Sequence, residues 1–138
     1  DFGTYISKML TVDSFFLNED RHTHNIAILV RNNNEYALCP IFDQGAGLLS
    51  DTTMDYPLNV DVYELIASAK PKTFCDNFLM QLELSEKLYG QNISFHFTDI
   101  DVDTILDAVP YEKYSKAIID RVRTVCYERI RQFRYLFT

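Results

Sequence analysis

The spacing of apolar residues along the chain predicts several helices. In residues 4–17 they recur every three or four positions, which indicates a helix that ends near Asn18. The same spacing returns in residues 61–69 and again in residues 74–89, where Gly90 interrupts the pattern. A helical first segment and two further helices are therefore expected before residue 90.

The last third of the chain predicts two more helices. Thr98 or Asp99 can cap a short helix that reaches Ala108, and Pro110 is suited to start the final one. Apolar residues of that final helix recur at helical spacing and form a stripe, with arginines expected on the opposite, solvated face. The stripe consists of Tyr114, Ile118, Val122, Val125, Ile130, Phe133 and Phe137.

Between the first two predicted helices the spacing of apolar residues is no longer helical. Residues 26–30 and 36–42 are short runs rich in strand-forming residues, and the asparagines at 32–34 tolerate the left-handed conformation of a tight turn. This pattern predicts one antiparallel β-hairpin, with Pro40 at an edge or a break in the ladder. Residues 43–58 have the glycine and proline content of a loop.

Length and composition favour one mainly α (α+β) domain over residues 1–138. The chain has 138 residues, of which 47% are hydrophobic, enough for a single core. It contains no apolar stretch of the roughly 20 residues that a membrane helix needs and no export signal at its start, so we expect no membrane. Three widely spaced cysteines among apolar neighbours indicate buried, reduced and slowly reacting thiols and a cytoplasmic location: Cys39, Cys75 and Cys126.

The formal net charge of −7 argues against direct nucleic-acid binding and against an acidic membrane surface. The charge is unevenly distributed, because residues 111–138 carry most of the lysines and arginines. A basic final helix beside an acidic body indicates that the two attract each other or that both face water.

A dense polar cluster, residues 20–25, directly precedes the first predicted strand. An antiparallel hairpin brings its two ends together, so Asn25 is expected to lie beside Phe42 and Asp43. Asp20, Asn25 and Asp43 would then offer two carboxylates and one amide oxygen. Such hard oxygen donors suit Mg²⁺, which binds a few carboxylates together with substrate phosphates.

A zinc site is the weaker alternative for the same cluster. His22 and His24 are two residues apart and would point to opposite sides of an extended segment. No cysteine lies near them in the sequence, and His96 is remote.

The spacing of these residues resembles a kinase site. Asp20 and Asn25 stand five residues apart, as do the aspartate and metal-binding asparagine of a kinase catalytic loop, and Asp43-Gln44-Gly45 follows the hairpin as a D-x-G motif. The chain resembles the C-terminal lobe of the protein-kinase-like fold, with one small β-hairpin carrying the site. The D-x-H-x-x-N order is similar to that of HipA-like serine/threonine kinases, and the D-R-H-x-x-N form also resembles phosphatidylinositol kinases.

The HipA-like resemblance, specific over residues 16–51, implies a role for each residue. Asp20 would be catalytic and accept or orient the proton of the substrate hydroxyl. Asn25 and Asp43 would hold Mg²⁺ on the phosphates of ATP, and His22 would support the loop through hydrogen bonds. The family further implies a protein substrate and a toxin-antitoxin context, with an antitoxin or repressor as partner.

Two parts of a kinase are not found in these residues, the glycine-rich loop and the strand lysine. In chain order both would lie upstream of residue 1, so the isolated chain is expected to be inactive. The alternative is a non-catalytic kinase-like interaction domain that binds a protein or repressor partner. Ser50, Thr52 and Thr53 occupy the place of an activation segment, and their role is left open.

Overall fold

Five α-helices and one two-stranded sheet make up the fold, and the computed structural model describes residues 1–138. This confirms the expected mainly α architecture with a small antiparallel sheet. No helix of the chain combines the length and the apolar character that a bilayer crossing requires. The elements are α1 (Phe2–Phe15), a 3₁₀ turn (Thr23–Asn25), β1 (Ile28–Val30), β2 (Tyr36–Leu38), α2 (Val62–Ser68), α3 (Phe78–Tyr89), α4 (Asp99–Asp107), α5 (Lys116–Gln132) and a second 3₁₀ turn (Arg134–Leu136).

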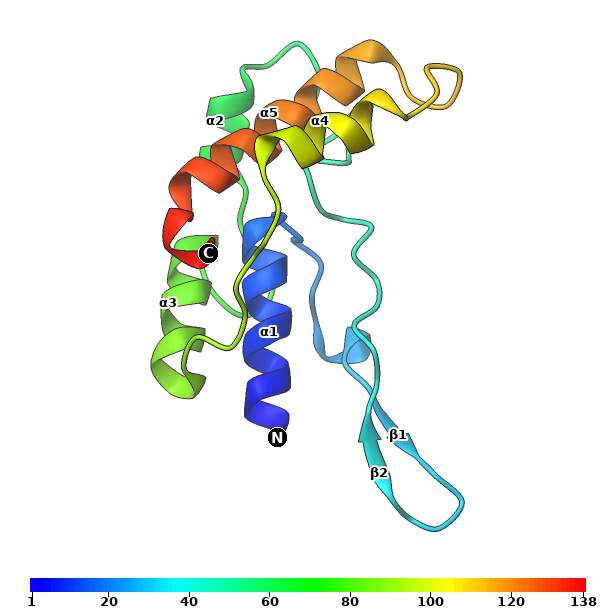
Figure 1. Cartoon of the computed structure of the whole chain (residues 1–138), viewed down its shortest axis with the longest axis vertical. Helices are drawn as coiled ribbons and strands as arrows, with labels where there is room; N and C mark the ends of the chain where they lie inside the picture. The colour runs from blue at the N-terminus through cyan, green and yellow to red at the C-terminus, as the bar shows by residue number, and fades with distance from the viewer.

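Helix α1 lies at the centre of the molecule and packs along α3, while α2 and α4 both pack against α5 (Figure 1). The C-terminal end of α1 meets α5, so the first and last helices of the chain are in contact there. The segment that leaves α1 at this end leads to the polar cluster.

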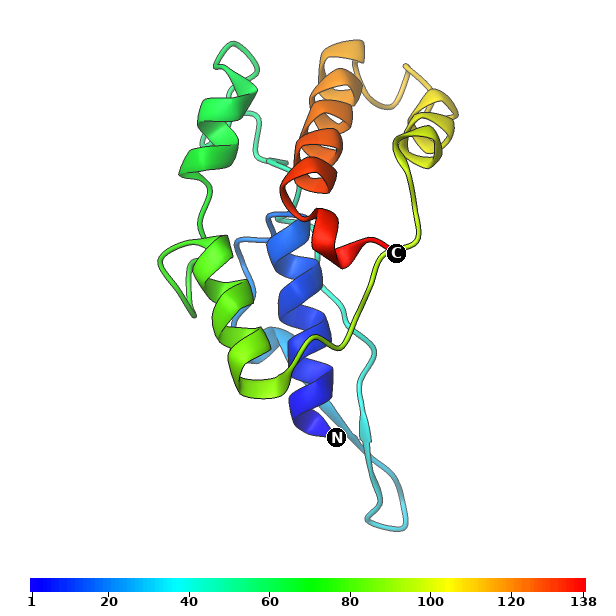
Figure 2. The same ribbon diagram turned by 60° about the vertical axis from the view of Figure 1, so that its left-hand side comes forward.

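The predicted hairpin is confirmed, and it projects away from the helices (Figure 2). Ile28 pairs with Leu38 and Val30 with Tyr36, and Asn34 in the turn has a positive φ of 60°. Both strands are largely exposed on both faces, including their apolar side chains. A two-stranded ribbon of this kind has little stability of its own.

The start of the last helix differs from the prediction. Ser115, not Pro110, caps α5, because its side chain accepts a hydrogen bond from the backbone N–H of Ile118. The carbonyl of Pro110 instead accepts hydrogen bonds from Lys113 and Tyr114 in a turn between α4 and α5. Tyr114 is consequently exposed and lies outside the helix.

The expected solvated arginine face of α5 is wrong at two positions, where the arginine is buried. Arg129 donates to the carbonyl oxygens of Ser14 (2.6 Å) and Phe15 (3.1 Å), at the end of α1. Arg121 donates to the carbonyl oxygens of Tyr56 and Pro57. Arg129 thereby satisfies carbonyls that the end of α1 leaves without a helical partner, and Arg121 binds carbonyls of the loop before α2.

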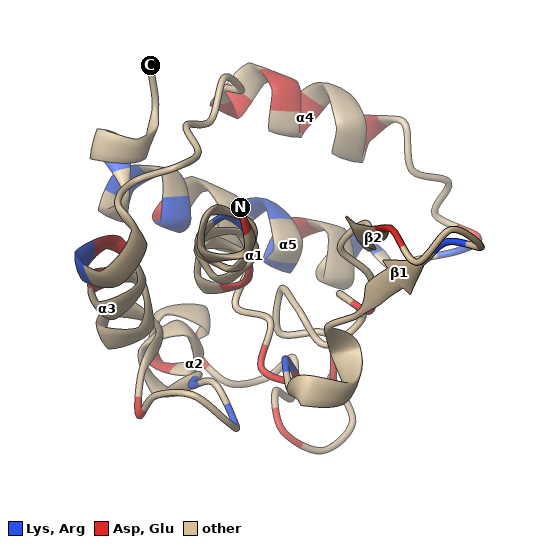
Figure 3. Ribbon diagram, turned by 90° about the horizontal axis from the view of Figure 1, so that it is seen from below, with Lys and Arg blue, Asp and Glu red and all other residues tan.

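Opposite charges on α4 and α5 do attract each other, as the charge distribution suggested. Acidic residues follow one another along α4, and basic residues along α5 (Figure 3). Arg123 forms ion pairs with Asp103 and Asp107, the latter at 2.7 Å. These pairs are partly exposed, so each contributes little to stability.

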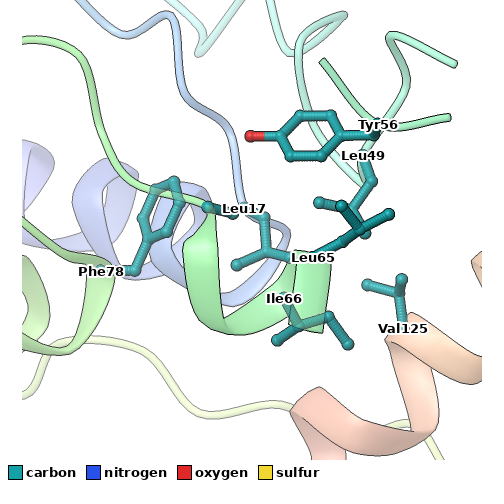
Figure 4. Packing of buried hydrophobic residues seen from close by; sticks show 8 residues of the cluster. Leu17, Leu49, Tyr56, Leu65, Ile66, Phe78 and Val125 are labelled. Carbon is teal, nitrogen blue, oxygen red and sulfur yellow. The ribbon is translucent and has the colours of Figure 1, made fainter. Parts of the chain in front are cut away.

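Two hydrophobic clusters fill the interior. The larger joins α2, α3 and α5 to the loop after the hairpin (Figure 4) and contains Leu17, Leu49, Tyr56, Leu65, Ile66, Ala69, Phe78 and Val125. The smaller is largely aromatic and surrounds the last residue of α1; it contains Phe15, Leu82, Phe95, Phe133 and Leu136. Leu17 of the first cluster and Phe15 of the second flank the end of α1, so both clusters fix the start of the polar segment.

The three cysteines are free thiols, but only Cys126 is fully buried. Cys39 follows the exposed strand β2 and Cys75 lies in the loop before α3, which leaves both half-buried. Burial raises the pKa of the Cys126 thiol to about 11 and, together with Asp76, also raises the pKa of Cys75. The expectation that all three are buried is therefore wrong for two of them.

We expect a thiol reagent at pH 8 to label Cys39 and Cys75 in the folded protein and to reach Cys126 only after unfolding. The reactive species is the thiolate, and Cys126 is both shielded and protonated at that pH. Mass spectrometry of the labelled peptides at successive times measures the order in which the three cysteines react. Labelling of Cys126 as fast as Cys75 would contradict its placement in the core.

Candidate functional site

The candidate site begins where α1 ends. The backbone N–H of Asn18 donates to the carbonyl oxygen of Asp13 at 2.8 Å, and Leu17 adopts a positive φ of 56°, which turns the chain away from the helix axis. The chain then runs through Asp20 and Arg21 into the short 3₁₀ turn, whose last residue is Asn25.

Arg21 is the best-anchored side chain of this segment. It is only 2% exposed, although its polar neighbours in the sequence are typical of a surface or phosphate-binding position. Its guanidinium binds the fully buried carboxylate of Asp13 through two nitrogens, at 2.7 and 3.1 Å. Asn18 donates to the same carboxylate at 2.7 Å. The buried charge of Arg21 is therefore neutralised by a carboxylate of α1, which explains its burial.

The same arginine joins the two segments that carry the candidate ligands. Nη1 of Arg21 donates to the carbonyl oxygen of Asn25 at 2.9 Å and to that of Phe42 at 2.7 Å. Asp43 follows Phe42 directly, so its backbone lies beside that of Asn25. The predicted approach of the two hairpin ends is thus present in the backbone, and Arg21 holds it in place.

The side chain of Asn25 uses its nitrogen and leaves its oxygen without a hydrogen bond. Its side-chain nitrogen donates to the carbonyl oxygen of Asp20 at 3.0 Å, and Asn25 is only 6% exposed. The amide oxygen Oδ1 takes no hydrogen bond from any other residue, so it is free to coordinate a cation. This hydrogen bond also links the candidate catalytic residue to the candidate ligand.

His22 makes the contacts of a supporting residue. Its Nδ1 accepts a hydrogen bond from the backbone N–H of His24 at 3.2 Å, which caps the 3₁₀ turn. Its Nε2 lies 3.9 Å from Oδ2 of Asp20, whose side chain is about half exposed. The two histidine rings do not diverge as expected for an extended segment; they meet edge to face at 5.5 Å, because the backbone turns between them.

The D-x-G segment docks against the end of α1. The backbone N–H of Leu48 donates to the carbonyl oxygen of Phe16 at 2.7 Å. A Cβ atom added at Gly47 would lie 3.0 Å from that same oxygen, so a larger residue there would push the two segments apart. Gly47 therefore permits the close approach of the segment that carries Asp43.

Left-handed backbone conformations are concentrated around these two segments. Leu17, Asp43, Leu48 and Leu49 all have positive φ values between 56° and 61°. Such conformations are uncommon for residues other than glycine and are costly for bulky side chains. Strain of this kind often occurs at functional sites, where the surrounding packing maintains it.

The hydroxyl-bearing residues of the following loop are held by local contacts. Ser50 donates to the carbonyl oxygen of Gly45 at 2.8 Å, and Thr53 donates to the carboxylate of Asp51 at 2.9 Å. Tyr56, further along, donates its hydroxyl proton to Glu19, and burial followed by this contact raises the pKa of Tyr56. The first two bonds shape the loop itself, and the bond to Glu19 ties the loop to the residue that precedes Asp20.

The residues expected to bind Mg²⁺ do not form a complete metal centre by themselves. The His, Cys, Asp and Glu side chains of the chain form no group of three that could by itself hold a metal ion. Two carboxylates and one amide oxygen, from Asp20, Asp43 and Asn25, therefore require further ligands. Mg²⁺ commonly obtains such ligands from water and nucleotide phosphates.

Sequence reasoning missed three residues that fix this arrangement: Asp13, Asn18 and Arg21. Asp13 offered one signal, because a carboxylate within the apolar first helix is expected to have a buried cationic partner. Comparisons of the chain with protein-family models, with curated proteins and with solved structures found no match. The functional interpretation therefore depends on the geometry of the site itself.

Proposed function

We propose that this chain is the catalytic-lobe part of an ATP- and Mg²⁺-dependent serine/threonine protein kinase of the HipA type. One observation carries the proposal: Arg21 binds the carbonyl oxygens of both Asn25 and Phe42. This contact sets the D-x-G segment beside the Asp20 to Asn25 loop, which is the pairing that phosphoryl transfer requires. The positive φ of Asp43 and the free Oδ1 of Asn25 support the same interpretation.

In the proposed reaction each residue has a separate task. Asp20, which is half exposed, orients the hydroxyl group of a protein substrate and accepts its proton. Asn25 and Asp43 hold Mg²⁺, which neutralises charge on the nucleotide phosphates when it is bound. His22 keeps the turn between Asp20 and Asn25 in shape through its bond to His24.

The proposal extends to the cellular context implied by the family resemblance. The kinase would act in the cytoplasm on a protein substrate, and an antitoxin or repressor protein would be its partner. The three free thiols agree with a reducing compartment.

A second function is favoured by the hairpin. Its apolar side chains are exposed, with Val30 at 65% and Tyr36 at 75%, and exposed apolar surface commonly marks a binding interface. A non-catalytic interaction domain would use this surface to bind a protein or repressor partner and would have no need for a nucleotide-bound metal ion.

Paramagnetic Mn²⁺ in the presence of ATP distinguishes the two functions. We expect Mn²⁺-ATP to broaden the backbone amide signals of Asn25 and Asp43 first in an NMR titration of the 138-residue chain. Asp43→Asn removes a charged ligand and is expected to weaken this effect by more than about tenfold, the scale of losses at metal sites. Asp55→Asn, an exposed aspartate of the same loop, is the matched control.

The isolated chain is expected to show no measurable ATP turnover, because it lacks the glycine and lysine contacts to the phosphates. Turnover that Asp20→Asn abolishes would contradict this expectation, although it would support the proposed kinase. If Mn²⁺-ATP does not broaden the signals of Asn25 and Asp43, or if Asp43→Asn leaves the broadening unchanged, the interaction domain would be favoured instead.

A further inference from the structure

A cavity of about 460 Å³ lies between the end of α1, the segment after Asp43 and the two helices α4 and α5. Its volume falls within the range of sites that bind small molecules. Its walls are mainly apolar and include Phe16, Leu48, Leu49, Val109, Ile118 and Val122. Gln44 and Gly45 also line this cavity, so it reaches the residues that follow Asp43 directly.

The charged groups that line the cavity already have hydrogen-bond partners within the protein. Asp13 and Arg121 are its charged lining residues, and both are buried. Arg21 and Asn18 already bind the carboxylate of Asp13, while Nη1 and Nη2 of Arg121 each donate to a backbone carbonyl oxygen. A charged ligand would lose its hydration and would compete with these existing bonds for an opposite charge, so the mainly apolar walls favour an uncharged one.

One lining residue retains an unused hydrogen-bond acceptor. Asn18 is 1% exposed and its side-chain nitrogen donates to Asp13, but its oxygen Oδ1 has no hydrogen-bond partner. The orientation of this amide group is fixed, because the carboxylate of Asp13 can accept a hydrogen bond only from the amide nitrogen. A buried acceptor without a partner is costly, and a donor supplied by a ligand would remove that cost.

From these observations we propose that the cavity is a binding site for an uncharged, largely apolar small molecule with one N–H or O–H donor. The ligand would lie between α1 and α5 and donate its proton to Oδ1 of Asn18. This site is separate from the proposed nucleotide site and does not depend on the proposed function. Its position beside Gln44 and Gly45 would place the ligand against the segment that carries Asp43.

Indole and benzofuran are matched probes, since they have nearly the same shape and only indole has an N–H donor. We expect indole to bind the 138-residue chain saturably and to shift the amide signals of Asn18 and of residues 44–50 in NMR spectra. Benzofuran is expected to bind about threefold to tenfold more weakly, the effect of one lost hydrogen bond. Equal affinity for the two probes would overturn the role of Asn18.

Two variants fill the cavity from different elements, Val109→Phe after α4 and Val122→Phe on α5. Each is expected to abolish indole binding, whereas Ile105→Phe, at a position 67% exposed, should leave it unchanged. Circular dichroism shows which variants are folded. The proposed site would be overturned if indole did not bind the wild-type chain saturably or if it shifted only the signals of other residues. Undiminished binding in a folded cavity-filling variant would overturn it as well.

Discussion

Replacing Arg21 with methionine is expected to lower the free energy of unfolding by about 3 to 5 kcal/mol, the cost of removing one partner of a buried ion pair. The change leaves the fully buried carboxylate of Asp13 without its cation. It also leaves the carbonyl oxygens of Asn25 and Phe42 without their shared donor. Urea denaturation followed by circular dichroism measures the loss.

Arg31→Met is the matched control for this variant. Arg31 lies in the hairpin turn, is exposed and forms no ion pair, so its replacement should change stability by less than about 0.5 kcal/mol. Arg21→Lys should recover only part of the loss, because an ammonium group cannot bind the carboxylate through two nitrogens and reach both carbonyls. Equal stabilities of Arg21→Met and Arg31→Met would show that the buried pair is misplaced.

Phe15→Ala is the second change with a large expected effect. The ring of Phe15 is 1% exposed and lies 4.7 Å from that of Phe95 and 5.6 Å from that of Phe137, measured between ring centroids. Its removal would leave a cavity among these rings and should cost about 3 to 5 kcal/mol of unfolding free energy. Thermal and urea denaturation together measure the effect.

Phe2→Ala, on the same helix, provides the comparison. Phe2 is 48% exposed and contacts only the ring of Tyr5 among the aromatic residues, so we expect a loss below about 1 kcal/mol. A similar loss in both variants would mean that the aromatic cluster does not hold the end of α1.

The hairpin and the helices could be predicted because their signals are local. Short runs of strand-forming residues on either side of Asn32, Asn33 and Asn34 indicate a ribbon regardless of its surroundings, and Gly90 ends α3 through its own positive φ of 80°. The start of α5 was misplaced because proline and serine both suit a helix start. The hydrogen bond from Ile118 to Ser115 decided between them.

The interior of the site could not be predicted in the same way. Arg21 stands in a run of polar residues, where a charged side chain ordinarily faces water. Its burial depends on Asp13, which lies on another element, and on carbonyl groups whose positions follow from the tertiary fold. Arg121 and Arg129 were misplaced for the same reason, because their partners are backbone atoms of distant segments.

The contact between Arg129 and the end of α1 has a consequence for the order of assembly during translation. Arg129 binds Phe15 and Ser14 across 114 and 115 residues of the chain, so α1 leaves the ribosome long before the helix that carries its partner. Until α5 has emerged, the last carbonyls of α1 lack this donor, and the adjoining polar segment lacks a fixed starting point. The nascent chain therefore completes the support of the segment around Asp20 only after α5 has left the ribosome.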